Sequence, residues 1–154
     1  MSAAKPAVVD ASVAVKWVVE EEFSDRAEAL LEAGMAFGLA LMAPPHFTGE
    51  VLNGLYQRTR RQALGSRLSE FEAFQAVEQF LGLDVRSVAP DGLYSGAFTF
   101  AREHRQANVY DALYVVLARM LRTEFWTADL SLLRAVGTIA PWVRWIGEYE
   151  PPNT

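Results

Sequence analysis

The sequence predicts one α/β domain, residues 1–154 with a core at about 7–146, built on a mostly parallel sheet of four to five strands. A length of 154 residues suits a single domain with a hydrophobic core of its own. The composition, 51% hydrophobic and 21% charged, is that of a globular chain. Short apolar runs alternate with longer segments of helical spacing, which is the pattern of βαβ units.

Alternating apolar runs and helical segments divide the chain into twelve predicted elements. The predicted strands are the short apolar runs at 7–9, 39–42, 83–85, 124–127 and 143–146. The predicted helices lie at 12–17, 24–34, 47–62, 69–81, 91–105, 108–118 and 130–135. Pro44 and Pro45 end the second strand because proline lacks the backbone N–H that a sheet requires. Gly65 separates the third helix from the fourth.

Capping side chains indicate where several of these helices begin. Ser12 and Ser24 are predicted caps in the first half of the chain, and Asn108 is one in the second half. Ser69 and Glu72 have the spacing of a capping box. The helix that follows Asn108 is apolar almost all round, which predicts a buried helix at the centre of the domain.

The composition excludes several kinds of site. The absence of cysteine excludes disulfides, thiolate zinc sites, iron–sulfur clusters and cysteine nucleophiles. The two histidines, His46 and His104, leave little room for a histidine-rich metal site, and we expect structural or surface roles for both. The longest uncharged stretch, 33–49, is interrupted by glycine and proline and falls short of the ~20 residues of a membrane span. No signal-peptide pattern precedes Asp10, so we expect a cytoplasmic protein without membrane contact.

Three aspartates occupy positions that favour a common crevice. Asp10 and Asp129 follow predicted strands, and ligands of open parallel sheets bind outside the carboxyl ends of the strands. Asp111 lies in the first turn of the buried helix, where an unpaired charge is costly. Each has a structural alternative, because Asp10 and Asp129 could cap the helices that follow and Asp111 could interact with the helix dipole. The convergence of all three favours a functional site.

Glu50 is the fourth candidate carboxylate. It lies inside a predicted helix beside Val51 and Leu52, with Asn53 on the same face; the alternative is a solvated surface glutamate. Carboxylates that share a site raise one another's pKa values unless a cation joins them. Oxygen ligands without histidine or cysteine suit Mg²⁺ or Mn²⁺. The chemistry that such a site favours is phosphodiester hydrolysis by metal-activated water.

Four segments share their order and spacing with a known family. The segments are Val8-Val9-Asp10-Ala11-Ser12, Pro45 with Glu50-Val51-Leu52-Asn53, Tyr110-Asp111-Ala112-Leu113-Tyr114 and Thr127-Ala128-Asp129. Together they resemble the PIN domain signature and, more narrowly, the VapC ribonuclease toxins of bacterial toxin–antitoxin pairs. The resemblance spans the chain from Ala7 to about Ile146. Ala11 stands where many members have threonine, and Ala128 separates Thr127 from Asp129, but neither departure removes an acidic position.

The resemblance implies a three-layer α/β/α fold and endonucleolytic cleavage of RNA. It also implies a pocket that binds Mg²⁺ or Mn²⁺ through Asp10, Glu50, Asp111 and Asp129. Ser12 or Thr127 would supply a hydroxyl to a pocket carboxylate or to the substrate, and Asn53 would support a pocket residue. Toxins of this family usually form homodimers, and a cognate antitoxin silences them by placing its tail in the groove.

Arginines beyond the Glu50 helix are the candidate RNA contacts. Arg58, Arg60 and Arg61 could bind phosphate bidentately, and Tyr56 could stack on a base. The alternative is a solvated basic helix end that interacts with the helix dipole. Setting four pocket acids aside from the net charge of −5 leaves −1, so the acidity of the chain does not exclude RNA, including tRNA or another structured RNA.

Two other functions stay open on the sequence alone. One is a PIN nuclease of RNA processing that is not a toxin. The other is a non-catalytic metal-binding or receiver-like interaction module, which also has an acidic pocket at strand ends. A receiver requires a lysine after its last strand, and the basic residue that this chain offers there is Arg144.

Overall fold

A parallel sheet of order β3-β2-β1-β4-β5 is the centre of the computed structural model, which describes residues 6–62, 65 and 67–152. Its strands are β1 (Ala7–Val9), β2 (Leu41–Ala43), β3 (Arg86–Ser87), β4 (Phe125–Thr127) and β5 (Val143–Trp145). The chain moves outward from β1 to β3 and then crosses to the other side of β1 for β4 and β5. The connections therefore diverge between β1 and β4, which makes the carboxyl ends of these two strands border a crevice.

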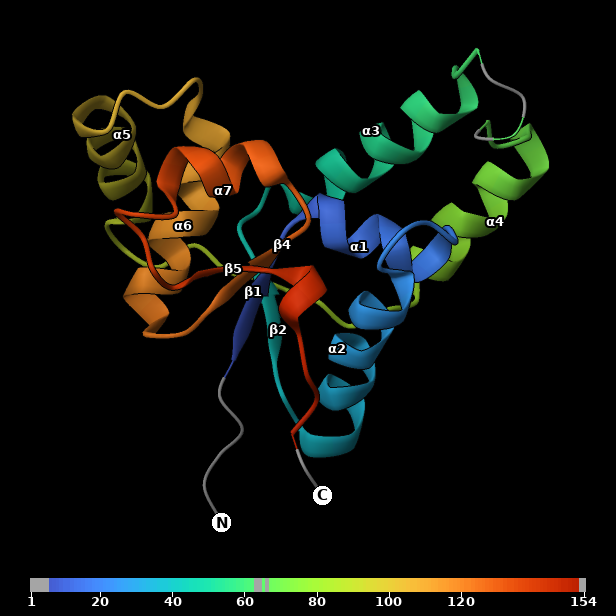
Figure 1. The fold of residues 1–154 in the computed structure, drawn as a ribbon, viewed down its shortest axis with the longest axis horizontal. Coiled ribbons are helices and arrows are strands. Elements are labelled where there is room, and N and C mark those ends of the chain that lie inside the picture. The colour runs from blue at the N-terminus through green and yellow to red at the C-terminus, as the bar shows by residue number, and fades with distance from the viewer. Residues whose placement is uncertain (1–5, 63–64, 66, 153–154) are drawn as a thin grey trace.

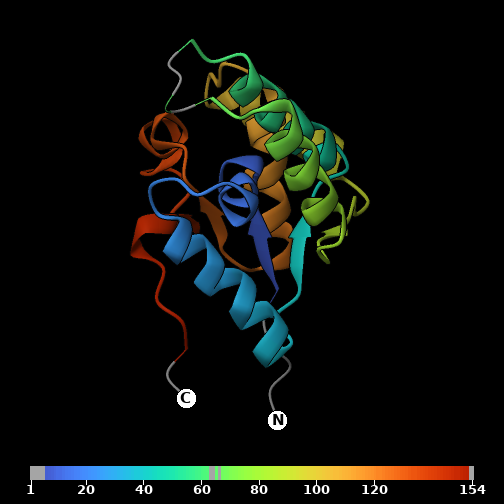
Figure 2. The same cartoon turned by 90° about the vertical axis from the view of Figure 1, so that its right-hand side faces the viewer.

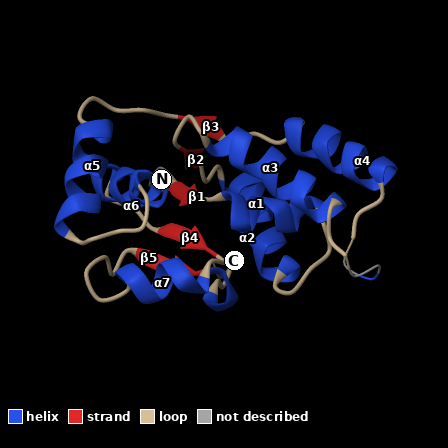
Figure 3. Cartoon of the chain, turned by 90° about the horizontal axis from the view of Figure 1, so that it is seen from above, coloured by secondary structure: helices blue, strands red, loops and turns tan. Residues whose placement is uncertain are grey.

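Helices cover both faces of the sheet, which confirms the predicted three-layer α/β architecture. They are α1 (Ala11–Val18), α2 (Ser24–Phe37), α3 (Phe47–Thr59), α4 (Glu70–Leu81), α5 (Leu93–Glu103), α6 (Val109–Leu121) and α7 (Leu130–Val136). Viewed from above, α1–α4 lie on one side of the strands and α5 and α6 on the other, while α7 lies beside β5 (Figure 3). The strand arrows point away from the end of the molecule at which both chain termini lie (Figure 1). Among the described residues, no helix is long and apolar enough to cross a membrane.

Helix α6 confirms the prediction of a central buried helix. Asn108 caps it by accepting a hydrogen bond of 3.1 Å from the backbone N–H of Asp111. Every residue from 112 to 118 is buried, because α5 covers one side of the helix and β1 and β4 lie against the other. This packing fixes the first turn of α6, and with it Asp111, near the carboxyl ends of the strands.

The predicted caps of the first two helices are wrong. The cap of α1 is Asp10, whose carboxylate accepts from the backbone N–H of Val13, while Ser12 lies inside the helix and donates to Asp10. Ser24 is the first residue of α2, and its hydroxyl donates instead to the carbonyl of Val19. The predicted capping box of Ser69 and Glu72 is confirmed at the start of α4.

Two strand positions differ from the prediction for a local reason. The third strand lies at 86–87 and not at 83–85, because Leu83 still donates a hydrogen bond of 3.0 Å to Phe80 in the turn that ends α4. The second strand lies at 41–43 and not at 39–42, because α2 continues to Phe37 and ends at Gly38, a left-handed residue with φ 65°.

Helices α3 and α4 pack side by side and extend beyond the sheet (Figures 1 and 2). An ion pair ties α3 to the segment after α1: the Nε and Nη2 of Arg58 each donate to a Glu21 oxygen at 2.8 Å. Lys16 lies 3.5 Å from the same carboxylate. Since Glu50 belongs to α3, these contacts also hold Glu50 in place relative to α1.

Candidate active site

The four predicted carboxylates come from four elements that meet at the carboxyl end of the sheet. Asp10 follows β1, Glu50 lies in the first turn of α3, Asp111 lies in the first turn of α6, and Asp129 separates β4 from α7. The charge of Asp111 interacts with the charges of the other three. The structure therefore brings all four into one electrostatically coupled cluster, at the divergence of β1 and β4.

Asp10 is the most deeply placed of the four, with only 7% of its surface exposed. Ser12 donates to one carboxylate oxygen and Thr127 to the other, each at 2.5 Å. Burial, with a smaller contribution from the charge of Asp111, raises the pKa of Asp10 to about 7 against the effect of these hydrogen bonds. Near neutral pH, a metal-free Asp10 thus binds and releases a proton.

The two hydroxyls that contact Asp10 also connect the start of α1 with the end of β4. Ser12 accepts from the backbone N–H of Ala128 at 2.8 Å, and Thr127 accepts from that of Asp129 at 3.1 Å. The two hydroxyl oxygens lie 3.3 Å apart. The resemblance implied that either Ser12 or Thr127 bonds a pocket carboxylate. In the structure both hydroxyls do so. Asp10 is held from α1 and from β4 at once.

Thr127→Val should lower the free energy of unfolding by about 1–3 kcal/mol. Valine has a similar shape but neither donates to Asp10 nor accepts from Asp129, and at 0% exposure no water replaces the hydroxyl. Urea unfolding at pH 7 measures the change. Thr59→Val is the matched control, because among the residues that the structure describes the Thr59 hydroxyl bonds the exposed carbonyl of Tyr56 alone. Equal effects of the two variants would contradict the role given to Thr127.

Asp129 combines a structural and a pocket position. Its Oδ1 caps α7 by accepting from the backbone N–H groups of Ser131 and Leu132, at 2.9 and 3.2 Å, as the structural alternative anticipated. Its charge still reaches Asp111. Burial, followed by the charges of Asp129 and Glu50, raises the pKa of Asp111 above its usual range. Asp129 can therefore cap α7 and belong to the acidic cluster at the same time.

Glu50 has two partners that the sequence reasoning did not assign to the site. The Tyr114 hydroxyl donates to Glu50 Oε1 at 2.6 Å, and His46 Nε2 lies 3.1 Å from the same oxygen. Burial alone would raise the pKa of Glu50, but His46 and Tyr114 outweigh it and lower that pKa below its usual value. His46 was expected in a structural or surface role and Tyr114 in the core. In the sequence, His46 lies four residues before Glu50 and Tyr114 three residues after Asp111. This helical spacing indicates that each could face the same side as a pocket carboxylate.

The other predicted residues lie on or beyond α3. Asn53 is exposed one turn after Glu50. Arg58 is held by Glu21, whereas the guanidinium of Arg60 lies 5.8 Å from the ring centre of Tyr56, a side chain that is 57% exposed. Arg61 is exposed just after the helix. Arg60, Arg61 and Tyr56 therefore form a basic and aromatic surface at the far end of the helix that contains Glu50.

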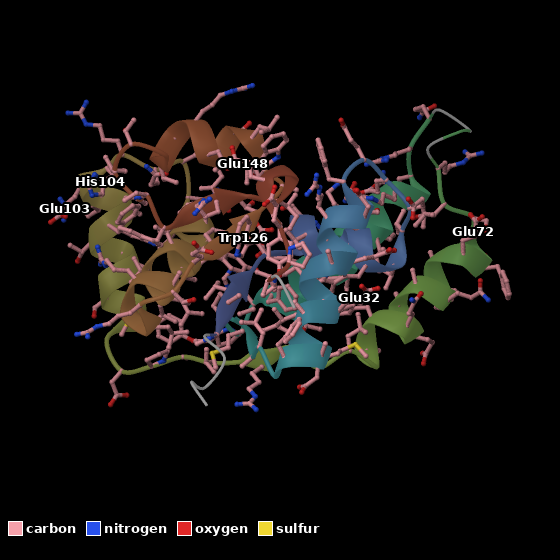
Figure 4. All side chains as sticks on the ribbon, turned by 60° about the horizontal axis from the view of Figure 1, so that its bottom comes forward. Glu32, Glu72, Glu103, His104, Trp126 and Glu148 are labelled. Atoms are coloured by element: carbon pink, nitrogen blue, oxygen red, sulfur yellow. The ribbon has the colours of Figure 1, made fainter. Side chains whose placement is uncertain are left out.

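The second histidine lies outside the cluster. His104 follows α5 and packs against the ring of Phe100, with 4.5 Å between ring centres. Beside Glu103, it stands at the outer edge of the molecule, whereas Trp126 of β4 lies at its centre (Figure 4).

The oxygen donors of the cluster suit a hard divalent cation. Burial and, to a smaller extent, mutual repulsion raise the pKa values of Asp10 and Asp111, and a cation between the carboxylates would stabilise their charged forms. Within the described part of the chain, no three acidic or histidine side chains already converge as ligands of one ion. Mg²⁺ needs no such cage, because it keeps several waters and binds few protein carboxylates. The donor set therefore fits Mg²⁺ or Mn²⁺.

Comparisons with known proteins show the fold and the family of the chain. No curated protein matches the sequence. The crystal structure of PAE2754 from Pyrobaculum aerophilum has a similar fold, with a TM-score of 0.60 and 16% identity over 94% of this chain and 92% of that chain. The sequence model of the PIN domain matches residues 7–137. The chain therefore belongs to the PIN domain family, whose members are typically metal-dependent nucleases.

Proposed function

We propose that this protein is an endoribonuclease that uses Mg²⁺ or Mn²⁺ to hydrolyse RNA phosphodiester bonds. The main support is the coupled cluster of Asp10, Glu50, Asp111 and Asp129 at the point where the connections of a parallel sheet diverge. Burial, together with repulsion between the carboxylates, raises the pKa values of Asp10 and Asp111, and a bound divalent cation would offset both effects.

The four carboxylates would hold the metal, which supplies an activated water and stabilises the charge that develops on phosphate. Ser12 and Thr127 keep both oxygens of Asp10 in fixed positions before any ligand binds. The capping bonds of Asp129 restrict its side chain in the same way. Because these carboxylate oxygens are already held in place, little side-chain conformational entropy would be lost when a metal binds.

The surface at the end of α3 supports a nucleic-acid substrate. Arg60 and Arg61 would contact phosphates, and the exposed ring of Tyr56 would stack on a base. Tyr56 lies six residues beyond Glu50 on the same helix, about 9 Å along its axis. The two side chains are also about 120° apart around the helix axis, so an RNA strand that contacts both has to pass around α3.

Cleavage of RNA by the purified protein tests this function. We expect a labelled tRNA or structured RNA to be cut with Mg²⁺ or Mn²⁺ and to stay intact in EDTA, whereas a DNA oligonucleotide of the same sequence is a poor substrate. The products should lack 2′,3′-cyclic phosphate, because the nucleophile is water and not the ribose hydroxyl. Undiminished cleavage in EDTA, or cyclic phosphate ends, would contradict the mechanism.

The proposed biological role is that of a toxin in a toxin–antitoxin pair, with a homodimeric protein and a cognate antitoxin as partner. The VapC-like order of its four motif segments supports this role. Induced expression should arrest growth, and co-expression of a short neighbouring gene for a DNA-binding protein should relieve the arrest. RNA cleavage in vitro without growth arrest would favour the alternative role in RNA processing.

A further inference from the structure

The side chains of His46 and Tyr114 meet at a single oxygen of Glu50. Tyr114 reaches it from α6, across 64 positions of sequence, and His46 from the residue that precedes α3. We propose that His46 and Tyr114 are positioning residues that hold Glu50 by Oε1 and thereby direct its other oxygen to the divalent cation. This inference rests on the proposed function.

Tyr114 is rigidly held at this position. It is 1% exposed, and its ring stacks on Phe125 of β4 with 5.4 Å between centres and 17° between planes. A buried tyrosine hydroxyl requires a partner, and this one donates to Glu50 at 2.6 Å. The packing of the ring in the core therefore fixes the position of the Tyr114 hydroxyl. The Glu50 side chain adopts the conformation that accepts its hydrogen bond.

His46 is placed against Glu50 in a different way. Its ring packs on Tyr114 and Tyr110, with ring centres 5.0 and 5.6 Å apart. Nε2 is buried and, among the described residues, has no partner in hydrogen-bond geometry, although it lies 3.1 Å from Glu50 Oε1. The Glu50 carboxylate therefore lies at contact distance from this nitrogen, outside the alignment of a directed hydrogen bond. A buried nitrogen without a hydrogen bond is unfavourable unless the neighbouring charge compensates for it.

Glu50 needs such support more than Asp10 and Asp129 do. Its side chain has one more rotatable bond than aspartate and is 38% exposed. Asp10 and Asp129 already accept from neighbouring hydroxyl or backbone groups. Contacts made before the metal binds reduce the entropy lost on binding, and removing such supporting contacts typically weakens metal affinity.

Calorimetric titration of the metal-free full chain with Mn²⁺ tests the inference. Tyr114→Phe removes only the hydroxyl and retains the stacking on Phe125, and His46→Phe removes the nitrogens and retains a ring. We expect each to weaken Mn²⁺ binding by about tenfold. Tyr94→Phe, an exposed tyrosine of α5, is the matched control and should leave the affinity unchanged.

A double-mutant cycle separates positioning from a general structural effect. In the Glu50→Gln background, Tyr114→Phe and His46→Phe should no longer change Mn²⁺ affinity, because their effect acts through the Glu50 carboxylate. The same loss in both backgrounds, or no loss in the native background, would overturn the inference and leave the proposed function standing. Absence of Mn²⁺ binding by the native chain would overturn both.

Discussion

Asp111→Asn is expected to reduce metal-dependent RNA cleavage by about 1000-fold and to raise the melting temperature of the metal-free protein. The lower cleavage rate follows from the position of Asp111, whose charge interacts with those of Asp10, Glu50 and Asp129. The higher melting temperature follows from the same interactions, because removing the charge of Asp111 relieves its repulsion from Asp129 and Glu50. Each kcal/mol of relief corresponds to about 2–4 °C in a protein of this size.

The two effects are measured separately. Gel-resolved cleavage of a labelled RNA gives the rate, and calorimetric or circular-dichroism melting in EDTA gives the stability. Asp91→Asn is the matched control, since Asp91 is an exposed aspartate before α5 and should change neither quantity. An Asp111→Asn protein that retains its cleavage rate would remove Asp111 from the proposed mechanism. A variant that melts lower than the native protein would contradict the repulsion described for the cluster.

The stability of the metal-free protein is expected to fall as pH rises from about 4 to about 7. Burial raises the pKa of Asp10 from 3.8 in the unfolded chain to about 7 in the folded protein, so the folded state binds the extra proton between these values. Deprotonation therefore costs folding free energy over this range, about 4 kcal/mol for Asp10 alone, and the loss levels off above pH 7. Glu21 and Glu50, whose pKa values are lowered, act in the opposite sense and only at more acidic pH.

Urea unfolding in EDTA at intervals from pH 4.5 to 8 measures this dependence. Asp10→Asn removes the titrating group, so its stability should change little over the same interval and exceed that of the native protein at pH 8. Mn²⁺ should stabilise the native protein most at the alkaline end, where Asp10 is ionised. Parallel pH profiles of the native protein and the variant would show that Asp10 does not titrate in this range.

The parts of the fold that the sequence predicted correctly are those set by neighbouring residues. The capping box of Ser69 and Glu72 and the cap at Asn108 depend on contacts three residues apart. Helix α6 is buried because its own sequence is apolar on every side. The strands of two or three residues were less well predicted, because pairing with neighbouring strands decides where so short a strand begins.

The order of the acidic residues along the chain was enough to propose the pocket, since strand ends and a buried helix start are recognisable locally. The sequence by itself thus determined the fold class, the family and the four candidate carboxylates. Their electrostatic states were decided only by the tertiary structure. Desolvation of Asp10, and the placement of His46 and Tyr114 at one oxygen of Glu50, depend on segments up to 117 positions apart. Such contacts arise from packing across the sheet, for which a single sequence contains no periodic signal.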